Sequence, residues 1–269
     1  MKVAKDPIGV FDSGLGGLTI VKEIRRVLPQ ESIVYFGDLA RLPYGIKSHK
    51  QIIQFSLQNT NFLLQHQIKT LIIACNSSSS AAYQVIKRKV SIPVIDVIEP
   101  ATREAVKLTR TGRIGVIATQ ATVDTGAYEK KLTKLNPNLE VYSRSCPMFV
   151  PMVEEGWTEG SICEQIVKHY LEPIKQKKVD VLMLGCTHYP LLESLIRNFM
   201  GSKVRLVNSA QSTVEKLVES LNSQKLLAHP DQKPSFKVYV SDQPRNFIRV
   251  GEKFLGERLS YVKVVRHAE

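Results

Sequence analysis

The chain has 269 residues, of which 37 are Lys or Arg and 25 are Asp or Glu, so its formal net charge is +12. Hydrophobic residues make up 43% and charged residues 23%, a balance typical of globular proteins and not of disordered or fibrous ones. No apolar run approaches the ~20 residues of a membrane-spanning helix, and residues 1–7 lack the apolar stretch of a secretory signal. Four cysteines are too few for a disulfide framework in a chain of this length. We therefore expect a cytoplasmic protein with free thiols and no membrane partner.

The positive charge is scattered along the chain. The longest contiguous basic run is Lys87-Arg88-Lys89, and the remaining cations lie mostly on predicted helix faces without interleaved aromatic residues. Such a pattern favours small anionic metabolites over a specific nucleic-acid partner. A non-catalytic binder of an anionic polymer stays open as a hypothesis of a different class.

Short apolar segments rich in β-branched residues alternate along the chain with segments of helical period, such as 18–28 and 48–65. Buried parallel strands have this composition. The predicted strands are, in chain order, 8–11, 33–36, 70–74, 94–97, 114–118, 141–143, 179–184, 204–207 and 236–240. The alternation predicts an α/β fold with doubly wound, mostly parallel sheets.

The strand pattern also repeats. The motif Ile-Gly-Val begins at residue 8 and again 106 residues later; Tyr35 and Tyr142 are 107 residues apart, and Cys75 and Cys186 are 111 residues apart. A cysteine at the same place in each copy predicts two pseudo-symmetric domains with a site in the cleft between them. We place the boundary near residue 98, before Pro100. The first domain is expected to comprise 1–98 and, by return of the C-terminal segment, 209–269; the second comprises 99–208.

Cys75 and Cys186 each follow a predicted parallel strand and precede a helix, at the sheet edge where ligands bind in such folds. A helix N-terminus lowers the pKa of a nearby thiol, so we expect both thiols to be activated. Two thiols that face each other could remove a proton from one face of a carbon acid and supply one to the other face, with no cofactor. The alternative is that each cysteine is a small buried hydrophobic residue.

Asp12 ends the first predicted strand and precedes the glycine-rich turn 13–17. The third glycine of a dinucleotide fingerprint would fall at Thr19, so that fingerprint fails. The turn and Ser13 still suit a small carboxylate. Asp12 could cap the following helix or, beside Cys75, take up or orient a proton.

His188 follows the second cysteine by two residues and could hydrogen-bond a substrate group. Glu154 or Glu155 could reach that cysteine or lie in solvent. Cys146 and Cys163 are most simply explained as packing residues. No C-x-x-C or H-x-x-x-H spacing occurs, so we predict no zinc site.

Several segments together resemble the glutamate racemases, of the cofactor-independent aspartate/glutamate racemase superfamily. The resemblance spans about residues 8 to 210 and is specific, because two cysteine motifs and other segments agree in order and spacing. The matching segments are 9–14 with 16–19, 35–38 followed by 40–41 and 43–45, 74–76, 98–100, 146–147 with 153–156, and 184–192.

The resemblance implies an isomerase that interconverts L- and D-glutamate without a cofactor and supplies D-glutamate for peptidoglycan synthesis. It implies that Cys75 is the base for the D-enantiomer, assisted by Asp12. Cys186 would be the base for the L-enantiomer, assisted by Glu154 and His188. The implied glutamate site consists of Asp12, Ser13, Tyr44, Gly45, Asn76, Ser77, Thr187 and His188. Homodimers are common in the family.

Two residues depart from the family pattern: Ser77 stands where threonine is usual, and Leu39 where a small hydroxyl residue is usual. Ser77 keeps the hydroxyl but loses a methyl group next to Cys75. A racemase of another amino acid such as aspartate, or a single-cysteine decarboxylase on the same scaffold, therefore remains an alternative. The chain also lacks the long N-terminal extension of some members, so we expect no activation by a cell-wall precursor.

Overall fold

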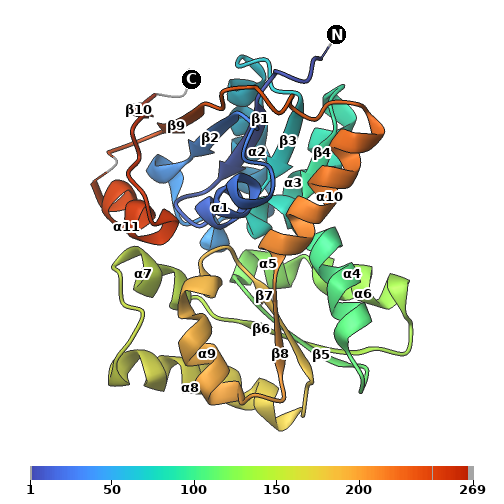
Figure 1. The fold of residues 1–269 in the computed structure, drawn as a ribbon. Coiled ribbons are helices and arrows are strands. Elements are labelled where there is room, and N and C mark those ends of the chain that lie inside the picture. Colours follow the sequence, from blue (N-terminus) through green and yellow to red (C-terminus); the bar gives the residue numbers. More distant parts are fainter. Residues whose placement is uncertain (1, 244, 266–269) are drawn as a thin grey trace.

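The computed structural model describes residues 2–243 and 245–265. The terminal residues 1 and 266–269 of the predicted first domain, and residue 244, lie outside the described residues. Figure 1 shows two α/β lobes, with the first described strand and the last described strand in the same lobe. Within the described residues no helix is long and apolar enough to cross a membrane.

The first lobe is built on a parallel sheet in the strand order β10-β9-β2-β1-β3-β4. Its strands are β1 (Ile8–Asp12), β2 (Ile33–Gly37), β3 (Thr70–Ile73), β4 (Val94–Asp96), β9 (Phe236–Val240) and β10 (Val262–Val264). All five residues of β1 are buried, because helices cover both faces of the sheet. This double cover explains why the strands are apolar throughout.

The second lobe has a parallel sheet in the order β6-β5-β7-β8. Its strands are β5 (Arg113–Ala118), β6 (Glu140–Ser145), β7 (Val181–Gly185) and β8 (Arg205–Asn208). The order matches β2-β1-β3-β4 of the first sheet strand for strand, so the repeat seen in the sequence is a repeat of structure. The predicted α/β class with two parallel sheets is confirmed.

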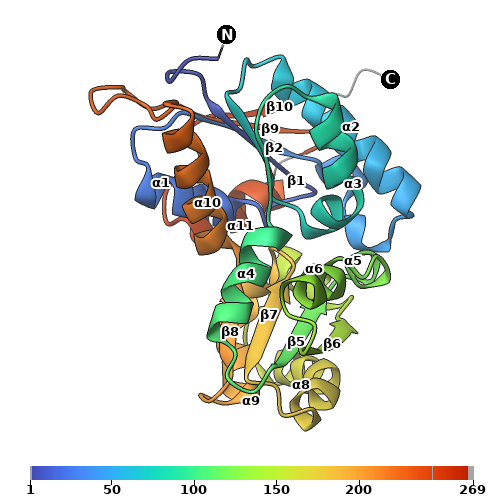
Figure 2. The same cartoon turned by 90° about the vertical axis from the view of Figure 1, so that its right-hand side faces the viewer.

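Helices flank both sheets, and Figure 2 shows them on either side of the strands. The helices are α1 (Leu18–Val27), α2 (His49–Leu64), α3 (Asn76–Lys89), α4 (Ile98–Leu108), α5 (Gln120–Asp124), α6 (Ala127–Leu135), α7 (Phe149–Glu154), α8 (Ser161–Gln176), α9 (Glu193–Met200), α10 (Ser209–Ser223) and α11 (Arg245–Leu255). Three short 3-10 helices are η1 (Leu39–Arg41), η2 (Tyr44–Ile46) and η3 (Tyr189–Leu192). A capping box of Ser48 and Gln51 begins α2, which supplies partners for the free N–H groups of its first turn.

Every predicted strand coincides with an observed strand, and the ends differ by at most two residues. The sequence analysis missed β10, because its three residues, Val-Lys-Val, are too short for a periodic signal. In the structure, β10 pairs with β9 at the edge of the first sheet. The domain boundaries themselves stay a prediction.

Candidate active site

Two turns from equivalent places in the lobes meet at the carboxyl ends of the strands. Cys75 lies between β3 and α3, and Cys186 follows β7 directly. Both thiols line one cavity, and their residues are only 5% and 7% exposed. All four cysteines of the chain are free, as expected. Cys146 and Cys163 lie in the hydrophobic core and are not among the residues that line this cavity, as expected of packing residues.

The cavity brings together most of the side chains named from the sequence. The predicted residues that line it are Ser13, Tyr44, Gly45, Cys75, Asn76, Ser77, Cys186, Thr187 and His188. Asp12 and Glu154 lie behind this lining and reach it through hydrogen bonds. The cavity volume is roughly 10 Å³, about the least that one water molecule needs. This state of the molecule is therefore closed to an amino acid.

Three lining residues were missed by the sequence analysis: Pro43, Thr119 and Val150. Thr119 could have been found, since it lies 106 residues after Ser13, the spacing of the repeated Ile-Gly-Val motif. Nothing in the sequence pattern marks Val150, which comes from α7 and reaches the cavity through tertiary packing.

Cys186 belongs to a chain of polar contacts within the second lobe. Its Sγ lies 3.8 Å from His188 Nδ1, and His188 Nε2 lies 2.6 Å from Glu154 Oε1. Burial opposes the charged imidazole, but the hydrogen bonds with Cys186 and Glu154 outweigh it and raise the pKa of His188 well above its ordinary value. An imidazolium next to a thiol stabilises the thiolate. Glu155, the other carboxylate considered, is exposed.

Cys75 has a different environment. Its Sγ donates to Ser13 Oγ at 3.6 Å, and burial, together with the nearby Asp12 carboxylate, raises the pKa of the Cys75 thiol to about 12. The prediction that the helix N-terminus lowers this pKa is therefore wrong, because loss of solvation in the closed cavity exceeds the effect of the helix. Cys75 is a neutral thiol at pH 7.

Asp12 is fully buried and spans the two lobes. Its Oδ1 accepts from the N–H of Gly14 at 2.8 Å, which closes the turn after β1, and its Oδ2 accepts from Thr187 Oγ1 at 3.1 Å. Burial raises the pKa of Asp12 above its ordinary value, against the lowering effect of His188. The carboxyl group is thus placed both as a structural link and as a candidate proton carrier.

Further contacts join the lobes around the cavity. Asn76 Nδ2 donates to Tyr128 OH at 2.7 Å, and Ser77 Oγ lies 2.9 Å from Thr119 Oγ1. Gly16 allows the closest approach, since a Cβ there would lie only 2.3 Å from Thr187 Oγ1. Within the described residues, no group of three or more His, Cys, Asp and Glu side chains could hold a metal ion.

Comparison with known proteins decides the family. The family model described as Asp/Glu/Hydantoin racemase matches residues 16–217. The chain belongs to this racemase family. A glutamate racemase from Geobacter metallireducens is 46% identical over 255 residues, which cover 95% of this chain and 94% of the relative. The resemblance stated from the sequence, to a family of isomerases, is therefore confirmed.

Solved structures of the family share the fold closely. A glutamate racemase isoform from Bacillus anthracis has a TM-score of 0.93 at 39% identity, with 97% of both chains covered. A glutamate racemase from Francisella tularensis, solved in complex with D-glutamate, has a TM-score of 0.92 at 42% identity, with 98% of both chains covered.

Proposed function

We propose that this racemase interconverts L-glutamate and D-glutamate by a two-base proton transfer at the α carbon. The observation that carries the proposal is that Cys75 and Cys186, from equivalent places in the two lobes, line the same cavity. Relatives more than 40% identical over nearly the whole chain are glutamate racemases, which supports glutamate as the substrate.

In the direction from L to D, Cys186 acts as a thiolate and removes the α proton. The His188 imidazolium, held by Glu154, stabilises that thiolate before the proton arrives. The electron pair left at the α carbon delocalises into the substrate carboxylate. The S–H bond of Cys75 then breaks as a C–H bond forms on the opposite face, which leaves a Cys75 thiolate and a Cys186 thiol. In the reverse direction the thiols exchange roles, and Asp12 assists Cys75.

In the proposed scheme the free protein is set for L-glutamate. The pKa of Cys75, raised to about 12 by burial, supports its role as a proton donor at neutral pH. The raised pKa of His188 supports a charged imidazole beside Cys186. On this basis the proposal takes Cys75 as the acid and Cys186 as the base.

The walls of the cavity supply groups for the rest of the substrate. Asn76 Oδ1 is buried and has no hydrogen-bond partner among the described residues, so it is available to accept from the substrate ammonium. We expect the residues implied by the resemblance to bind the carboxylates, including Ser13, Gly45 and Ser77. Because the closed cavity is too small for glutamate, the lobes separate as the substrate enters.

The experiment is turnover in deuterated water with three proteins: the wild type, Cys75→Ala and Cys186→Ala. Each product molecule formed by the wild type gains one solvent deuterium at Cα, and both variants lose racemisation in both directions. Cys163→Ala, which removes a thiol outside the cavity, is the matched control and keeps its activity. Full racemisation by either cavity variant would refute the two-base scheme.

The alternative reactions predict different products. A decarboxylase of this kind protonates its product with one cysteine only, so the presence of Cys186 beside Cys75 in the cavity favours the racemase. Conversion of aspartate but not glutamate, followed by circular dichroism, would favour the related racemase. Tight DNA binding at physiological salt without turnover of any amino acid would favour a polymer binder.

The biological setting is part of this proposal. D-glutamate made by the protein would enter peptidoglycan synthesis in the cytoplasm. Homodimers are common among the proteins that the chain resembles, so a homodimer is the assembly to test. Sedimentation of the purified protein with and without glutamate tests the assembly.

A further inference from the structure

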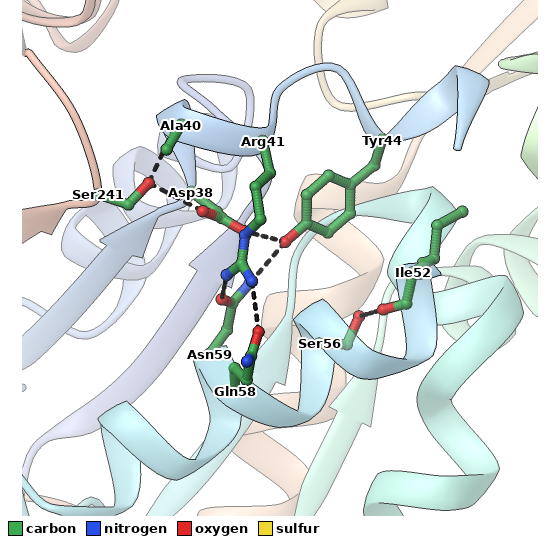
Figure 3. Close-up of polar contacts among 9 residues, drawn as sticks. All are labelled: Asp38, Ala40, Arg41, Tyr44, Ile52, Ser56, Gln58, Asn59 and Ser241. Atoms are coloured by element: carbon green, nitrogen blue, oxygen red, sulfur yellow. Dashed lines mark hydrogen bonds and ion pairs between the residues drawn. The ribbon is translucent and has the colours of Figure 1, made fainter. Parts of the chain in front are cut away.

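A network of polar side chains is centred on the fully buried Asp38 (Figure 3). Arg41 Nε donates to Asp38 Oδ2 at 2.7 Å, and Ser241 Oγ donates to Asp38 Oδ1 at 2.8 Å. The phenol of Tyr44 also donates to Asp38 Oδ2. Of these residues, only Tyr44 lines the cavity.

The side chain of Tyr44 is anchored on several sides and is 1% exposed. Besides donating to Asp38, its hydroxyl accepts from Asn59 Nδ2 at 3.1 Å. The Tyr44 ring contacts Phe55 with a centroid distance of 5.6 Å, and the guanidinium of Arg41 lies 4.2 Å from the centre of the same Phe55 ring. The tyrosine thus has one well-defined position.

The segment that carries this anchor forms the cavity wall and touches the second lobe. Gly45 follows Tyr44, and a Cβ on Gly45 would lie 2.6 Å from Thr119 Cβ. Because Gly45 has no side chain, its backbone packs directly against Thr119 when the lobes are closed, and packed interiors transmit small shifts. A shift of the Tyr44 side chain therefore moves the wall that faces the substrate.

The sheet explains how Asp38 and Ser241, 203 positions apart in the sequence, come together. β9 pairs with β2, with Val240 opposite Gly37, so Ser241 and Asp38 leave the same edge side by side. Ser241 N donates to Gly37 O at 3.1 Å, and Ala40 N donates to Ser241 Oγ at 2.9 Å. The C-terminal part of the chain thereby supplies one hydroxyl to the network.

We infer that Asp38, Arg41 and Ser241 are positioning residues for substrate binding, which act by holding Tyr44 and so the wall formed by Tyr44 and Gly45. The inference rests on the proposed function, in which this wall contacts glutamate. None of the three is among the residues that line the cavity. Their loss therefore raises KM for both enantiomers and leaves kcat nearly unchanged.

The test compares Tyr44→Phe, Ser241→Ala and a matched control. Ser56 is also fully buried and lies near the network on α2, but its hydroxyl donates to Ile52 O of its own helix at 2.7 Å (Figure 3). We expect KM to rise on the order of tenfold in Tyr44→Phe and about threefold in Ser241→Ala. The kcat values stay within about twofold, and Ser56→Ala matches the wild type. An unchanged KM in both network variants, or an equal rise in Ser56→Ala, overturns the inference.

A rescue variant separates the hydroxyl from general packing. Ser241→Thr keeps the hydroxyl and is expected to keep the wild-type KM. If Ser241→Thr and Ser241→Ala raise KM equally, the hydrogen bond to Asp38 is not the cause and the inference fails. Urea unfolding of each variant confirms that folded protein is compared.

Direct binding distinguishes this inference from the proposed reaction. Calorimetric titration with D-glutamate measures binding as heat; racemisation during the titration adds no heat, because the two enantiomers have equal enthalpy in water, and the apparent Kd then refers to the mixture of enantiomers. Binding by a wild-type protein that does not racemise glutamate contradicts the two-thiol function, whereas a Kd about threefold weaker in Ser241→Ala still supports the positioning role. A wild type that binds no glutamate contradicts both.

Discussion

The contact between Glu154 and His188 allows a quantitative prediction. The two side chains are separated by 2.6 Å, with His188 2% and Glu154 18% exposed. A hydrogen bond to a charged partner contributes about 1.5–3 kcal/mol, which equals roughly one to two pKa units. Glu154→Gln keeps a neutral acceptor but removes the charge, so only the difference from a neutral hydrogen bond is lost and the pKa of His188 falls by about one unit.

Catalysis in the proposed scheme uses the protonated form of His188, and this fixes the direction in which the pH profile moves. The raised pKa of His188 means that the imidazolium persists from low pH until the pH rises through this pKa. Lowering the pKa therefore moves the alkaline limb of the profile of kcat/KM against pH down by about one unit and leaves the acidic limb in place.

The assay is circular dichroism of racemisation between pH 6 and about 11. Because the two enantiomers have equal free energy in water, kcat/KM is the same in both directions for every variant. A directional defect instead appears as a larger primary deuterium isotope effect with L-glutamate, the substrate whose proton Cys186 removes. The control is Glu155→Gln, which changes the exposed neighbour. An alkaline limb that stays in place, or an equal shift in the control, would show that the charge of Glu154 does not hold the pKa of His188 high.

Three further predictions concern other parts of the chain. Gly16→Ala places a Cβ 2.3 Å from Thr187 Oγ1, so kcat/KM falls on the order of a hundredfold while the far-ultraviolet spectrum is unchanged; near-normal turnover would contradict the close approach. The buried Lys69 lies 2.5 Å from Glu31. Lys69→Met leaves the buried Glu31 carboxylate without its cation and lowers the free energy of unfolding in urea by about 3–5 kcal/mol. A loss below about 1 kcal/mol would count against a buried ion pair. Cys163→Ala changes kcat/KM by less than about twofold and lowers the free energy of unfolding by about 1 kcal/mol. A loss of turnover in this variant would show that the Cys163 thiol takes part in catalysis, although it does not line the cavity.

The arrangement of the site was predictable to the extent that it follows from parallel strands. Cys75 and Cys186 end equivalent strands of a repeat, and parallel strands deliver their carboxyl ends to one edge. The repeat therefore predicted that both cysteines face a shared cleft. The same reasoning extends to Thr119, which occupies the position of Ser13 in the second copy.

Other features depend on tertiary structure, which no local pattern reports. The pKa of Cys75 depends on how completely the closed cavity excludes water, and it is raised. The position of Cys75 at a helix N-terminus would by itself predict a lowered pKa. The link between Asp38 and Ser241 arises only after β9 has paired with β2. Val150 lines the cavity because α7 packs against η3. These two elements are far apart in the sequence, so the local residue pattern could not predict their contact.

The central claim is that two sulfur atoms flank one chiral carbon. A crystal structure of the protein with D-glutamate bound tests it most directly. Two-base proton transfer requires Sγ of Cys75 and Sγ of Cys186 on opposite faces of Cα, each ~3–3.5 Å from it. Thiols on the same face, or either sulfur held beyond contact distance while the ligand is bound, would contradict the account.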